Sequence, residues 1–376
     1  MHTTTCDAAV AGAGVFGVWT AYRLARTGRS VVLLDALGVA DPRASSGAES
    51  RLIRAAYGAS ELYTRFAVES LEAWKEIVPS LFRPTGAVWF DSPQSERLAA
   101  SREALDRAGV RFEALDAAEI RRRYSQVRLP EDVAGIFEPD AGVILAGDAT
   151  RAVSDAAQQL GVQLLHERIA TPVRNGEVFL NSGDRLIAET FVFACGAWLP
   201  KLFPQIHSDV ITPTRQELFF FQSPGPNFSA PDLPAWIDET DPRVPYCFPD
   251  IEQHGVKVGF HHLGPPFDPD TGDRTTTEQG AAEMRTYIAA RMPGLANTPL
   301  IASRVCQYEN TPTGDFLIDR HREFPNIWFA GGGSGHGFKH GPAVGRYIVD
   351  RLENRGNEEP AFSLESKLKA GERSVI

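Results

Sequence analysis

The chain has 376 residues, which exceeds the ~250–300 residues at which a single hydrophobic core stops growing, so two domains are expected. Its 43% hydrophobic and 23% charged residues are typical of a globular protein, and no apolar run approaches the ~20 residues that span a bilayer. A net charge of −10 disfavours nucleic acid as a partner, because a nucleic-acid-binding face needs excess Lys and Arg. We expect a cytoplasmic protein that binds neither membrane nor nucleic acid.

The start of the chain predicts a strand, a glycine-rich turn, a helix and a second strand. The first strand, at 8–11, leads into Gly12, Gly14 and Gly17, and the second strand ends just before Asp35. Gly12 permits a sharp turn, Gly14 lets a pyrophosphate approach the helix N-terminus, and Gly17 lets the helix pack closely on the strand. Asp35 is then placed to accept a hydrogen bond from an adenosine ribose. The expected dinucleotide-binding residues are Gly12, Gly14, Val15, Phe16, Gly17 and Asp35.

Two arginines, Arg51 and Arg54, follow the loop after Asp35. This position predicts that they lie near the cofactor. Because a guanidinium binds a carboxylate through two parallel hydrogen bonds, the pair indicates a clamp for an anionic substrate. The alternative left open is a salt-bridged helix start.

The spacing of apolar residues predicts the elements in the middle of the chain. Helices are expected over 62–76, over the charged stretch 93–124, from 148 onward and over 280–291. Strands are expected at 86–91, 135–142, 186–195, 217–221 and 256–261. The last of these alternates apolar and polar residues, as in an antiparallel sheet. From about 354 the tail is expected to be dispensable for the fold.

A second glycine cluster near the end of the chain separates NAD from FAD as the cofactor. An apolar strand at 327–330 delivers the glycines of 331–337, and a helix is expected over 343–352. An NAD domain would complete its sheet in one continuous run, whereas here about three hundred residues intervene. This arrangement favours FAD held by an interrupted domain.

The predicted fold class is α/β, with a discontinuous Rossmann-like FAD-binding domain and an inserted antiparallel-sheet substrate domain of α+β type. We assign residues 1–85, 140–213 and 315–376 to the FAD-binding domain, and residues 86–139 and 214–314 to the substrate domain.

Several polar residues are ambiguous from the sequence alone. Lys257 lies in an otherwise apolar strand, where a lysine usually faces solvent, although facing a flavin it could stabilise negative charge that develops during reaction with oxygen. Tyr246, His261 and Tyr308 are individually more typical of packed aromatic or satisfied polar groups. Only their joint placement could change that interpretation.

A metal site is not predicted. The spacing of His336 and His340 would suit zinc on a regular helix, but the surrounding glycines disfavour such a helix. The four cysteines show neither CxxC pairing nor metal-ligand spacing, which in a cytosolic protein predicts reduced thiols.

Taken in order, several segments resemble the monomeric sarcosine oxidase and N-methyltryptophan oxidase branch of the D-amino-acid-oxidase-like flavoproteins. The matching segments are 10–17 with Asp35, 51–54, 257–261, 306–308 before Thr311-Pro312, 316–319 and 334–339. They span nearly the whole chain. The cysteine segment and the Ser-Gly-His-Gly-Phe-Lys segment are the specific ones, because many flavoproteins share the first motif.

The resemblance implies roles for individual residues. Cys306 would hold FAD through a covalent thioether, and Arg54 and Lys339 would bind the substrate carboxylate. Lys257 would assist the reaction with oxygen, Arg51 would lie against the flavin ring, and Tyr246, His261 and Tyr308 would line the substrate cavity. The expected cofactor contacts further include Ser45, Gly333, Gly335, His336, Gly337, Phe338 and Lys339.

The chain departs from the family pattern in the loop before the arginine pair, where relatives often carry histidines and this chain has Ser45, Ser46 and Gly47. Where an acidic residue is often found after the Thr-Pro pair, the chain has Thr313. These departures bear on the covalent link and on the substrate's identity.

The function expected is that of a monomeric FAD-dependent oxidase of a small amino acid. An N-methyl amino acid such as sarcosine, or a cyclic imino acid, would lose hydride to flavin N5, and the resulting imine would hydrolyse while O2 becomes H2O2. Two alternatives stay open: a 2-hydroxy acid or amino acid dehydrogenase with another electron acceptor, and a non-catalytic flavin-binding subunit of a larger complex.

Overall fold

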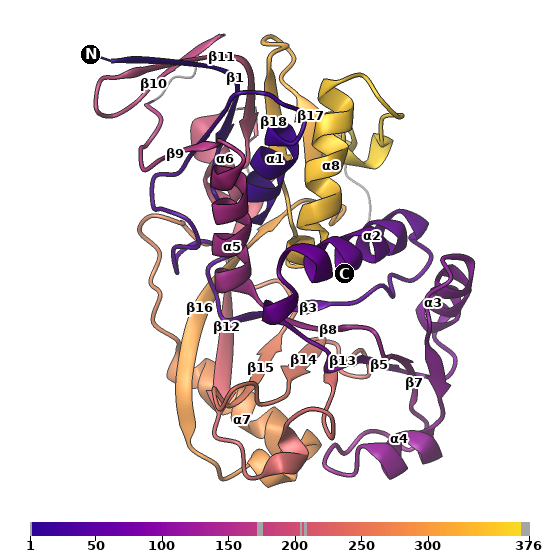
Figure 1. The fold of residues 1–376 in the computed structure, drawn as a ribbon. Coiled ribbons are helices and arrows are strands. Elements are labelled where there is room, and N and C mark those ends of the chain that lie inside the picture. Colours follow the sequence, from indigo (N-terminus) through magenta and orange to yellow (C-terminus); the bar gives the residue numbers. More distant parts are fainter. Residues whose placement is uncertain (1, 171–175, 204, 207–208, 370–376) are drawn as a thin grey trace.

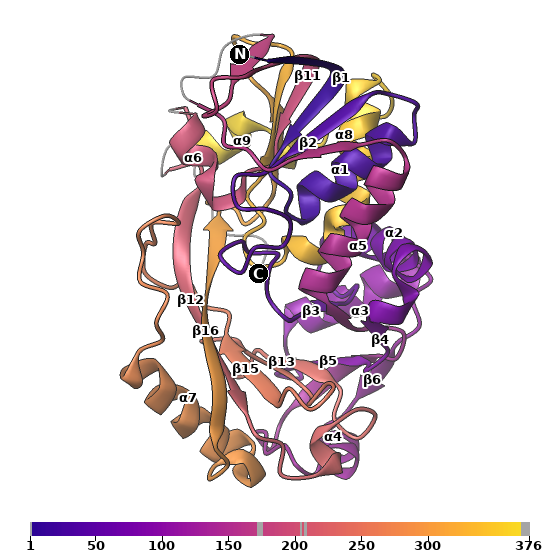
Figure 2. The same ribbon diagram turned by 60° about the vertical axis from the view of Figure 1, so that its left-hand side comes forward.

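The computed structural model describes residues 2–170, 176–203, 205–206 and 209–369, and its strands form three sheets. The first sheet lies at the top of Figure 1 and the second at the bottom, with the long strands β12 (Thr212–Phe221) and β16 (Leu300–Asn310) running between their levels. Figure 2 shows the same two strands along one side of the molecule. The predicted α/β fold class is confirmed.

The first sheet is mainly parallel. Its order is β17-β18-β11-β1-β2-β9, with β10 pairing β11, and the pairs that β1 makes with β11 and β2 are parallel. Its strands are β1 (Thr3–Ala11), β2 (Val31–Leu34), β9 (Gln163–Leu165), β10 (Glu177–Phe179), β11 (Arg185–Phe193), β17 (Leu317–Arg320) and β18 (Ile327–Gly331). The terminal strand-glycine-helix unit therefore returns to the sheet that the first motif begins.

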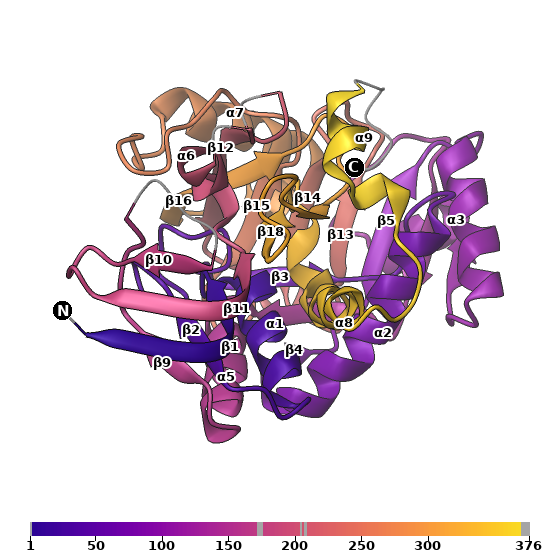
Figure 3. The same ribbon diagram turned by 90° about the horizontal axis from the view of Figure 1, so that it is seen from above.

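Both faces of this sheet are covered, as a parallel sheet requires. Ala8 and Val10 of β1 face the helices, whereas Ala9 and Ala11 face a second apolar cluster on the opposite side, because successive side chains of a strand alternate. Helix α8 (Gly341–Leu352) packs between α1 (Val15–Ala25) and α2 (Glu61–Ile77), and α5 (Ala146–Gln159) packs on α1 (Figure 3).

The second sheet has the order β16-β12-β15-β14-β13-β5-β7-β6 and is antiparallel except where β13 pairs β5. Its remaining strands are β5 (Ala87–Asp91), β6 (Glu113–Leu115), β7 (Ala134–Glu138), β13 (Ala235–Asp238), β14 (Pro245–Phe248) and β15 (Val256–Phe260). Helix α7 (Glu278–Arg291) contributes Met284, Tyr287 and Ile288 to the apolar cluster of this sheet. The expected antiparallel strand at 256–261 is thus present.

A small third sheet, β3-β8-β4, links the two regions. It consists of β3 (Ser50–Ile53), β4 (Phe82–Arg83) and β8 (Gly142–Leu145). The segment that carries Arg51 is therefore a strand, and the alternative of a salt-bridged helix start is wrong. Arg51 lies opposite Ile144 across this antiparallel pair.

The prediction of one helical stretch over 93–124 is wrong. Helix α3 (Glu96–Arg107) ends because Gly109 has φ +66° and the Val110 amide bonds back to Leu105, the hydrogen bond of a Schellman motif. Strand β6 follows, and Asp116 then caps α4 (Ala117–Arg123) by accepting a hydrogen bond from the Glu119 amide at 2.8 Å.

The tail is part of the fold, contrary to expectation. Phe362 is fully buried in the core beside α2 and α8, and Leu364, at the start of α9 (Leu364–Leu368), is buried on the other side of the first sheet. The Leu364 amide also donates to Asp319 at 2.7 Å. Residues 370–376 of the expected tail lie outside the described residues.

The strands of the first and third sheets come from segments assigned to the FAD-binding domain, and those of the second sheet from segments assigned to the substrate domain, apart from the first residues of β12. The division into two domains stays a prediction. None of the helices in the described part of the chain is long and apolar enough to cross a bilayer.

Candidate active site

A cavity of about 540 Å3 lies at the carboxyl ends of β1 and β11. This size is in the range of ligand pockets, ~300–1,000 Å3. Twelve of the predicted cofactor-binding residues line it: Gly12, Gly14, Val15, Phe16, Asp35, Ser45, Arg51, Cys306, Gly333, Gly335, Gly337 and Phe338. Ligands bind at this edge of open α/β sheets.

The glycine turn has the geometry that its sequence predicts. Gly12 has φ +98°, and a Cβ there would lie 2.3 Å from the carbonyl oxygen of Ala194. A Cβ on Gly17 would lie 1.7 Å from the carbonyl oxygen of Gly12, so α1 packs on the turn at a distance that no larger residue allows. Gly17 packs against the turn and does not itself line the cavity.

Polar groups near the turn are fixed by the protein itself. Asp35 accepts hydrogen bonds from the Ala13 amide at 2.6 Å, the Leu37 amide at 2.7 Å and the Gly38 amide at 2.9 Å, which leaves one acceptor position of its carboxylate for a ligand. Ser46 Oγ accepts from the Val15 amide at 2.9 Å in the first turn of α1. Ser45 Oγ donates to the carbonyl of Gln307 at 2.9 Å, which joins this loop to β16.

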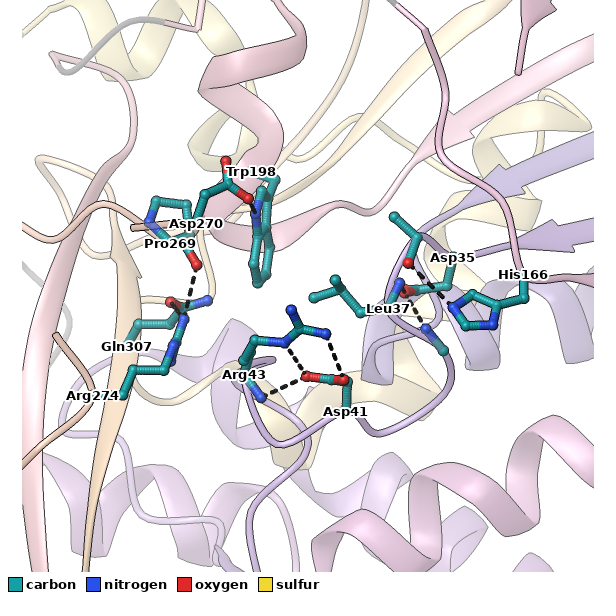
Figure 4. Close-up of polar contacts among 12 residues, drawn as sticks. Asp35, Leu37, Asp41, Arg43, His166, Trp198, Pro269, Asp270, Arg274 and Gln307 are labelled. Atoms are coloured by element: carbon teal, nitrogen blue, oxygen red, sulfur yellow. Dashed lines mark hydrogen bonds and ion pairs between the residues drawn. The ribbon is translucent and has the colours of Figure 1, made fainter. Parts of the chain in front are cut away.

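Figure 4 shows Asp35 and Leu37 on one side of the larger cavity and Trp198 and Gln307 on the other. The segment 261–277, between β15 and α7, reaches across to the second side. There Trp198 Nε1 donates to Asp270 at 2.8 Å, and Arg274 donates to the side-chain oxygen of Gln307 at 2.9 Å. This side of the larger cavity is therefore formed by segments next to the first sheet and by segments next to the second sheet.

A smaller cavity of about 100 Å3 adjoins the first. Arg51, Cys306, Tyr308, Gly335 and Phe338 line both cavities. The other lining residues of the smaller cavity are Leu52, Arg54, Gln216, Leu218, Ile237, Tyr246, Phe248, Lys257, His261, His336 and Lys339. All seven residues predicted for substrate binding or catalysis thus meet in one place.

Two cations, Arg54 and Lys339, lie at one end of the smaller cavity. The Arg54 guanidinium lies between the rings of Tyr57 and Trp89, 4.5 and 4.2 Å from their centroids, and donates to the carbonyl of Ala56. Lys339 Nζ donates to Tyr57 Oη at 2.7 Å and to the His336 carbonyl at 3.0 Å. Neither cation takes part in an ion pair among the described residues, and both are buried.

Burial governs the ionisation of this cluster. It lowers the pKa of Lys339 well below its ordinary value, and the neighbouring Arg54 lowers it further. Burial raises the pKa of Glu138, whose carboxylate accepts from the amides of Ala55 and Ala56 at 2.7 and 3.0 Å. An incoming carboxylate would replace part of the solvation that both cations lack.

Lys257 is buried, so the interpretation that this lysine faces solvent is wrong. Its Nζ donates to the Ser50 carbonyl at 2.8 Å and lies 4.6 Å from the centroid of the Phe248 ring. Burial, followed by the charge of Arg51, lowers its pKa to about 7. The surroundings of this lysine therefore oppose its protonation.

Aromatic and imidazole groups close the smaller cavity. His261 Nδ1 lies 3.1 Å from Tyr308 Oη. Burial raises the pKa of Tyr246, which packs against Gly259 of the neighbouring strand. The residue pattern alone did not indicate that these side chains meet, because they come from β14, β16 and the residue after β15, whereas the family resemblance implied it.

His336 and His340 do not form a metal site among the described residues. As the glycines indicated, Gly337–His340 is a 3-10 turn before α8. Tyr57 Oη lies 3.2 Å from His336 Nδ1 and 2.8 Å from His340 Nε2, and burial lowers the pKa of both histidines. His336 and Lys339 border the smaller cavity and not the larger one.

Cys306 lies where the two cavities meet. Its Sγ lies 3.8 Å from an Arg51 guanidinium nitrogen and 3.7 Å from the Gln307 carbonyl. Arg51 also donates to the carbonyls of Ser45 and Ser50. The guanidinium thus holds the serine-containing loop, β3 and the cysteine together.

Sequence reasoning missed the residues that shape the site without carrying a motif. Tyr57 and Trp89 flank Arg54, and Ile237 and Gln216 line the smaller cavity from β13 and β12. Trp89 and Ile237 lie in short apolar strands. In such strands a residue that lines a cavity and a residue that packs in the core give the same sequence pattern. The carboxyl of Glu309 was also missed; it lines the larger cavity.

Comparison with known proteins is consistent with this geometry. The model of the FAD dependent oxidoreductase family DAO matches residues 7–351, and the chain belongs to this family. It is 32% identical to the monomeric sarcosine oxidase of Bacillus sp. (strain B-0618), with 96% of this chain and 95% of the relative covered. It is 25% identical to the N-methyl-L-tryptophan oxidase of Escherichia coli O139:H28, with 94% and 96% covered.

Among solved structures, L-proline dehydrogenase from P. horikoshii matches with a TM-score of 0.85 and 21% identity, covering 99% of this chain and all of that one. This likeness shows a shared fold. The resemblance found in the sequence is confirmed, and the protein is an FAD-dependent oxidoreductase.

Proposed function

We propose that the protein oxidises the C–N bond of a small amino acid, either an N-methyl amino acid such as sarcosine or a cyclic imino acid. The resulting imine hydrolyses in water, and O2 is reduced to H2O2. The observation that carries the proposal is that two buried basic side chains, Arg54 and Lys339, line a small cavity beside the cofactor cavity and form no ion pair among the described residues. The names of the relatives, sarcosine oxidase and N-methyl-L-tryptophan oxidase, support the reaction class.

The larger cavity fits FAD by its own construction. The turn at Gly12 and Gly17 leaves no room for a Cβ and brings the backbone and the N-terminus of α1 to the cavity wall, where a pyrophosphate is favoured. Asp35 can accept a hydrogen bond from a ribose hydroxyl, and Gly333, Gly335 and Phe338 line the same cavity. When bound, FAD supplies the hydride acceptor for the oxidation.

Arg54 and Lys339 bind the substrate carboxylate in this proposal. The Tyr57 and Trp89 rings hold the guanidinium plane in place, and Tyr57 holds the lysine, so little side-chain freedom is lost on binding. Fixing the carboxylate aims a C–H bond next to the nitrogen at the neighbouring cofactor cavity.

The substrate nitrogen must be neutral to lose hydride, because an ammonium has no lone pair to stabilise the iminium that forms. Activity therefore rises with pH as this nitrogen is deprotonated, and the optimum lies above neutrality. Tyr246, His261 and Tyr308 line the cavity around the nitrogen, and Lys257 supplies a positive charge for the reaction with oxygen.

The size of the smaller cavity favours substrates with short side chains. Its volume of about 100 Å3 is less than a fifth of the cofactor cavity. Leu52, Leu218, Ile237 and Phe248 form the apolar part of its wall. Sarcosine and cyclic imino acids of similar size are thus favoured over N-methyltryptophan.

A covalent thioether between Cys306 and FAD is part of the proposal, supported by the position of the cysteine on both cavities. Acid precipitation of the purified protein tests it: a covalent flavin stays in the pellet, whereas a dissociable flavin colours the supernatant. Cys306→Ser should move the colour to the supernatant. A colourless pellet from the parent protein contradicts the link.

The electron acceptor is tested by following oxygen uptake and H2O2 release with sarcosine, L-proline and L-pipecolate. Stoichiometric peroxide supports an oxidase. Turnover with an artificial acceptor but without peroxide supports the alternative of a dehydrogenase, and oxidation of 2-hydroxy acids instead of amino acids contradicts the proposed substrate class. We further propose a cytoplasmic monomer with the two domains assigned above.

A further inference from the structure

The side chain of Glu309 faces the larger, cofactor cavity and not the smaller one. Successive side chains of β16 point to opposite faces. Cys306 and Tyr308, on one face, line both cavities, whereas Gln307 and Glu309, on the other face, line only the larger one. Glu309 therefore faces the cofactor rather than the amino acid.

Only one of the two carboxyl oxygens of Glu309 has a hydrogen-bond partner among the described residues. Its Oε1 accepts a hydrogen bond from the Gly333 amide at 3.3 Å, but its Oε2 is buried and has no hydrogen-bond partner among the described residues. A Cβ added to Gly196 would lie 3.0 Å from Oε2, and one added to Gly333 would lie 2.9 Å from Oε1. Gly196 and Gly333 pack closely against the carboxyl, and Glu309 lines the larger cavity, so a ligand in that cavity can supply the partner that Oε2 lacks.

The environment of Glu309 favours its neutral form. Burial raises the pKa of Glu309 to about 7, and the Gly333 amide opposes this only in part. None of the ion pairs among the described residues includes Glu309. A carboxylate here would also repel the pyrophosphate of a dinucleotide in the same cavity.

The position of Glu309 identifies the part of FAD that it meets. Gly12, in the turn expected to bind phosphate, packs against Ala194 and Cys195. Gly196, which follows Cys195 in the chain, packs against Glu309. Glu309 in turn follows Tyr308, which lines both cavities. The carboxyl thus lies between the pyrophosphate end and the flavin-ring end of the cavity. In FAD these ends are joined by the ribityl chain, which carries hydroxyl groups.

We propose that the Glu309 carboxyl hydrogen-bonds a ribityl hydroxyl group of FAD through Oε2 and so positions the cofactor. A hydroxyl suits this site because it can both accept the carboxyl proton and donate to the carboxyl oxygen. The proposal rests on the proposed orientation of the cofactor, with its ring toward the substrate cavity, and does not depend on which amino acid is oxidised.

The test measures FAD affinity in a Cys306→Ser background, in which the cofactor can exchange. Apoprotein with Glu309, with Glu309→Ala and with Glu309→Gln is titrated with FAD and with its 2′-, 3′- and 4′-deoxyribityl analogues, using flavin fluorescence. Glu309→Ala should weaken FAD binding about three- to tenfold, the value of one hydrogen bond. One deoxy analogue should lose a similar factor against Glu309 and none against Glu309→Ala.

The pH dependence gives an independent result. With Glu309, the FAD dissociation constant should rise above pH 7 as the carboxyl ionises, by up to about tenfold per pH unit, whereas Glu309→Gln should remove this rise. Glu309→Gln has the same shape and guards against a folding defect in Glu309→Ala, and Glu278→Gln, on the exposed first turn of α7, is the control.

Equal losses for all analogues in both proteins, with an unchanged pH dependence in Glu309→Gln, would overturn the role of Glu309 while leaving the proposed function intact. A parent apoprotein that bound no FAD would overturn both. Intact FAD binding without substrate oxidation would overturn only the proposed function.

Discussion

The larger and the smaller cavity are built from different materials. The larger is lined in part by glycines that follow β1, β11 and β18, where the backbone itself forms the wall, and in part by side chains from several loops. The smaller is walled by side chains, with buried cations at Arg54, Lys257 and Lys339. A backbone wall suits a cofactor that many reactions share, whereas a side-chain wall can be changed residue by residue to select a substrate.

The largest effect is expected from Gly12→Ala, which should disrupt the backbone that lines the larger cavity. The new Cβ would lie 2.3 Å from the Ala194 carbonyl at a φ of +98°, so we expect a loss of about 2–5 kcal/mol in the free energy of unfolding and no retained FAD. Gly28→Ala is the matched control, because Gly28 has φ +84° but nothing within 4 Å of its Cβ. Denaturant unfolding and flavin absorbance measure both effects; equal behaviour of the two variants would contradict the close approach.

The side-chain wall is broken by Arg54→Met, which should leave FAD in place. Losing two charge-assisted hydrogen bonds to the carboxylate should lower kcat/KM by a factor of about 100 to 10,000. Arg111→Met, at an exposed arginine paired with Asp140, serves as the control. A loss of FAD equal to the loss of activity would mean that Arg54 belongs to the cofactor cavity instead.

Lys257→Met separates the two halves of the reaction. If the buried ammonium assists the reaction with oxygen, turnover with O2 should fall by a factor of about 100 to 1,000, while turnover with an artificial electron acceptor changes little. Steady-state rates with both acceptors at saturating amino acid measure the difference. A parallel fall with both acceptors would assign Lys257 to substrate binding.

The same variant tests the burial of Lys257 through the pH dependence of stability. Because the folded-state pKa is about 7 and the ordinary value is 10.5, the unfolded chain binds a proton between these pH values that the folded protein does not. The parent therefore gains stability as pH rises, and the advantage of Lys257→Met should shrink by about 1.4 kcal/mol per pH unit from pH 7.5 to 9.5. Chemical denaturation across this range gives the slope, with Lys75→Met, at a half-exposed lysine of α2, as a baseline. Parallel curves for Lys257→Met and the parent would contradict a displaced pKa.

The two cavities also differ in how much the sequence could predict. The glycine turn and Asp35 lie close together in the chain, so their spacing in the sequence determines their geometry. The strand-glycine-helix pattern at 327–352 resembles the first motif, which predicted that this segment joins the same sheet. The smaller cavity combines side chains from β3, β12–β15, β16 and the turn before α8. No local pattern says that Lys257 faces inward: the residues alone allowed either a solvent-facing lysine or one that faces a flavin, and the resemblance favoured the second.

The errors have the same physical origin. In the 93–124 stretch the helical periodicity outweighed two weaker signals, Gly109 and Asp116, that end α3 and begin α4. The tail was undervalued because Phe362 and Leu364 are isolated apolar residues whose partners lie far away in the chain. Glu309 was passed over because a lone acidic residue in a strand usually faces solvent.

The most direct measurement of the central claim is anaerobic mixing of the FAD-loaded protein with single substrates while the visible absorption of the flavin is followed. Sarcosine, L-proline or L-pipecolate should bleach the flavin, whereas N-methyl-L-tryptophan and 2-hydroxy acids should not, because the small cavity beside Arg54 and Lys339 admits a short amino acid. Bleaching by a 2-hydroxy acid or by N-methyl-L-tryptophan, with none by the small amino acids, would contradict the account.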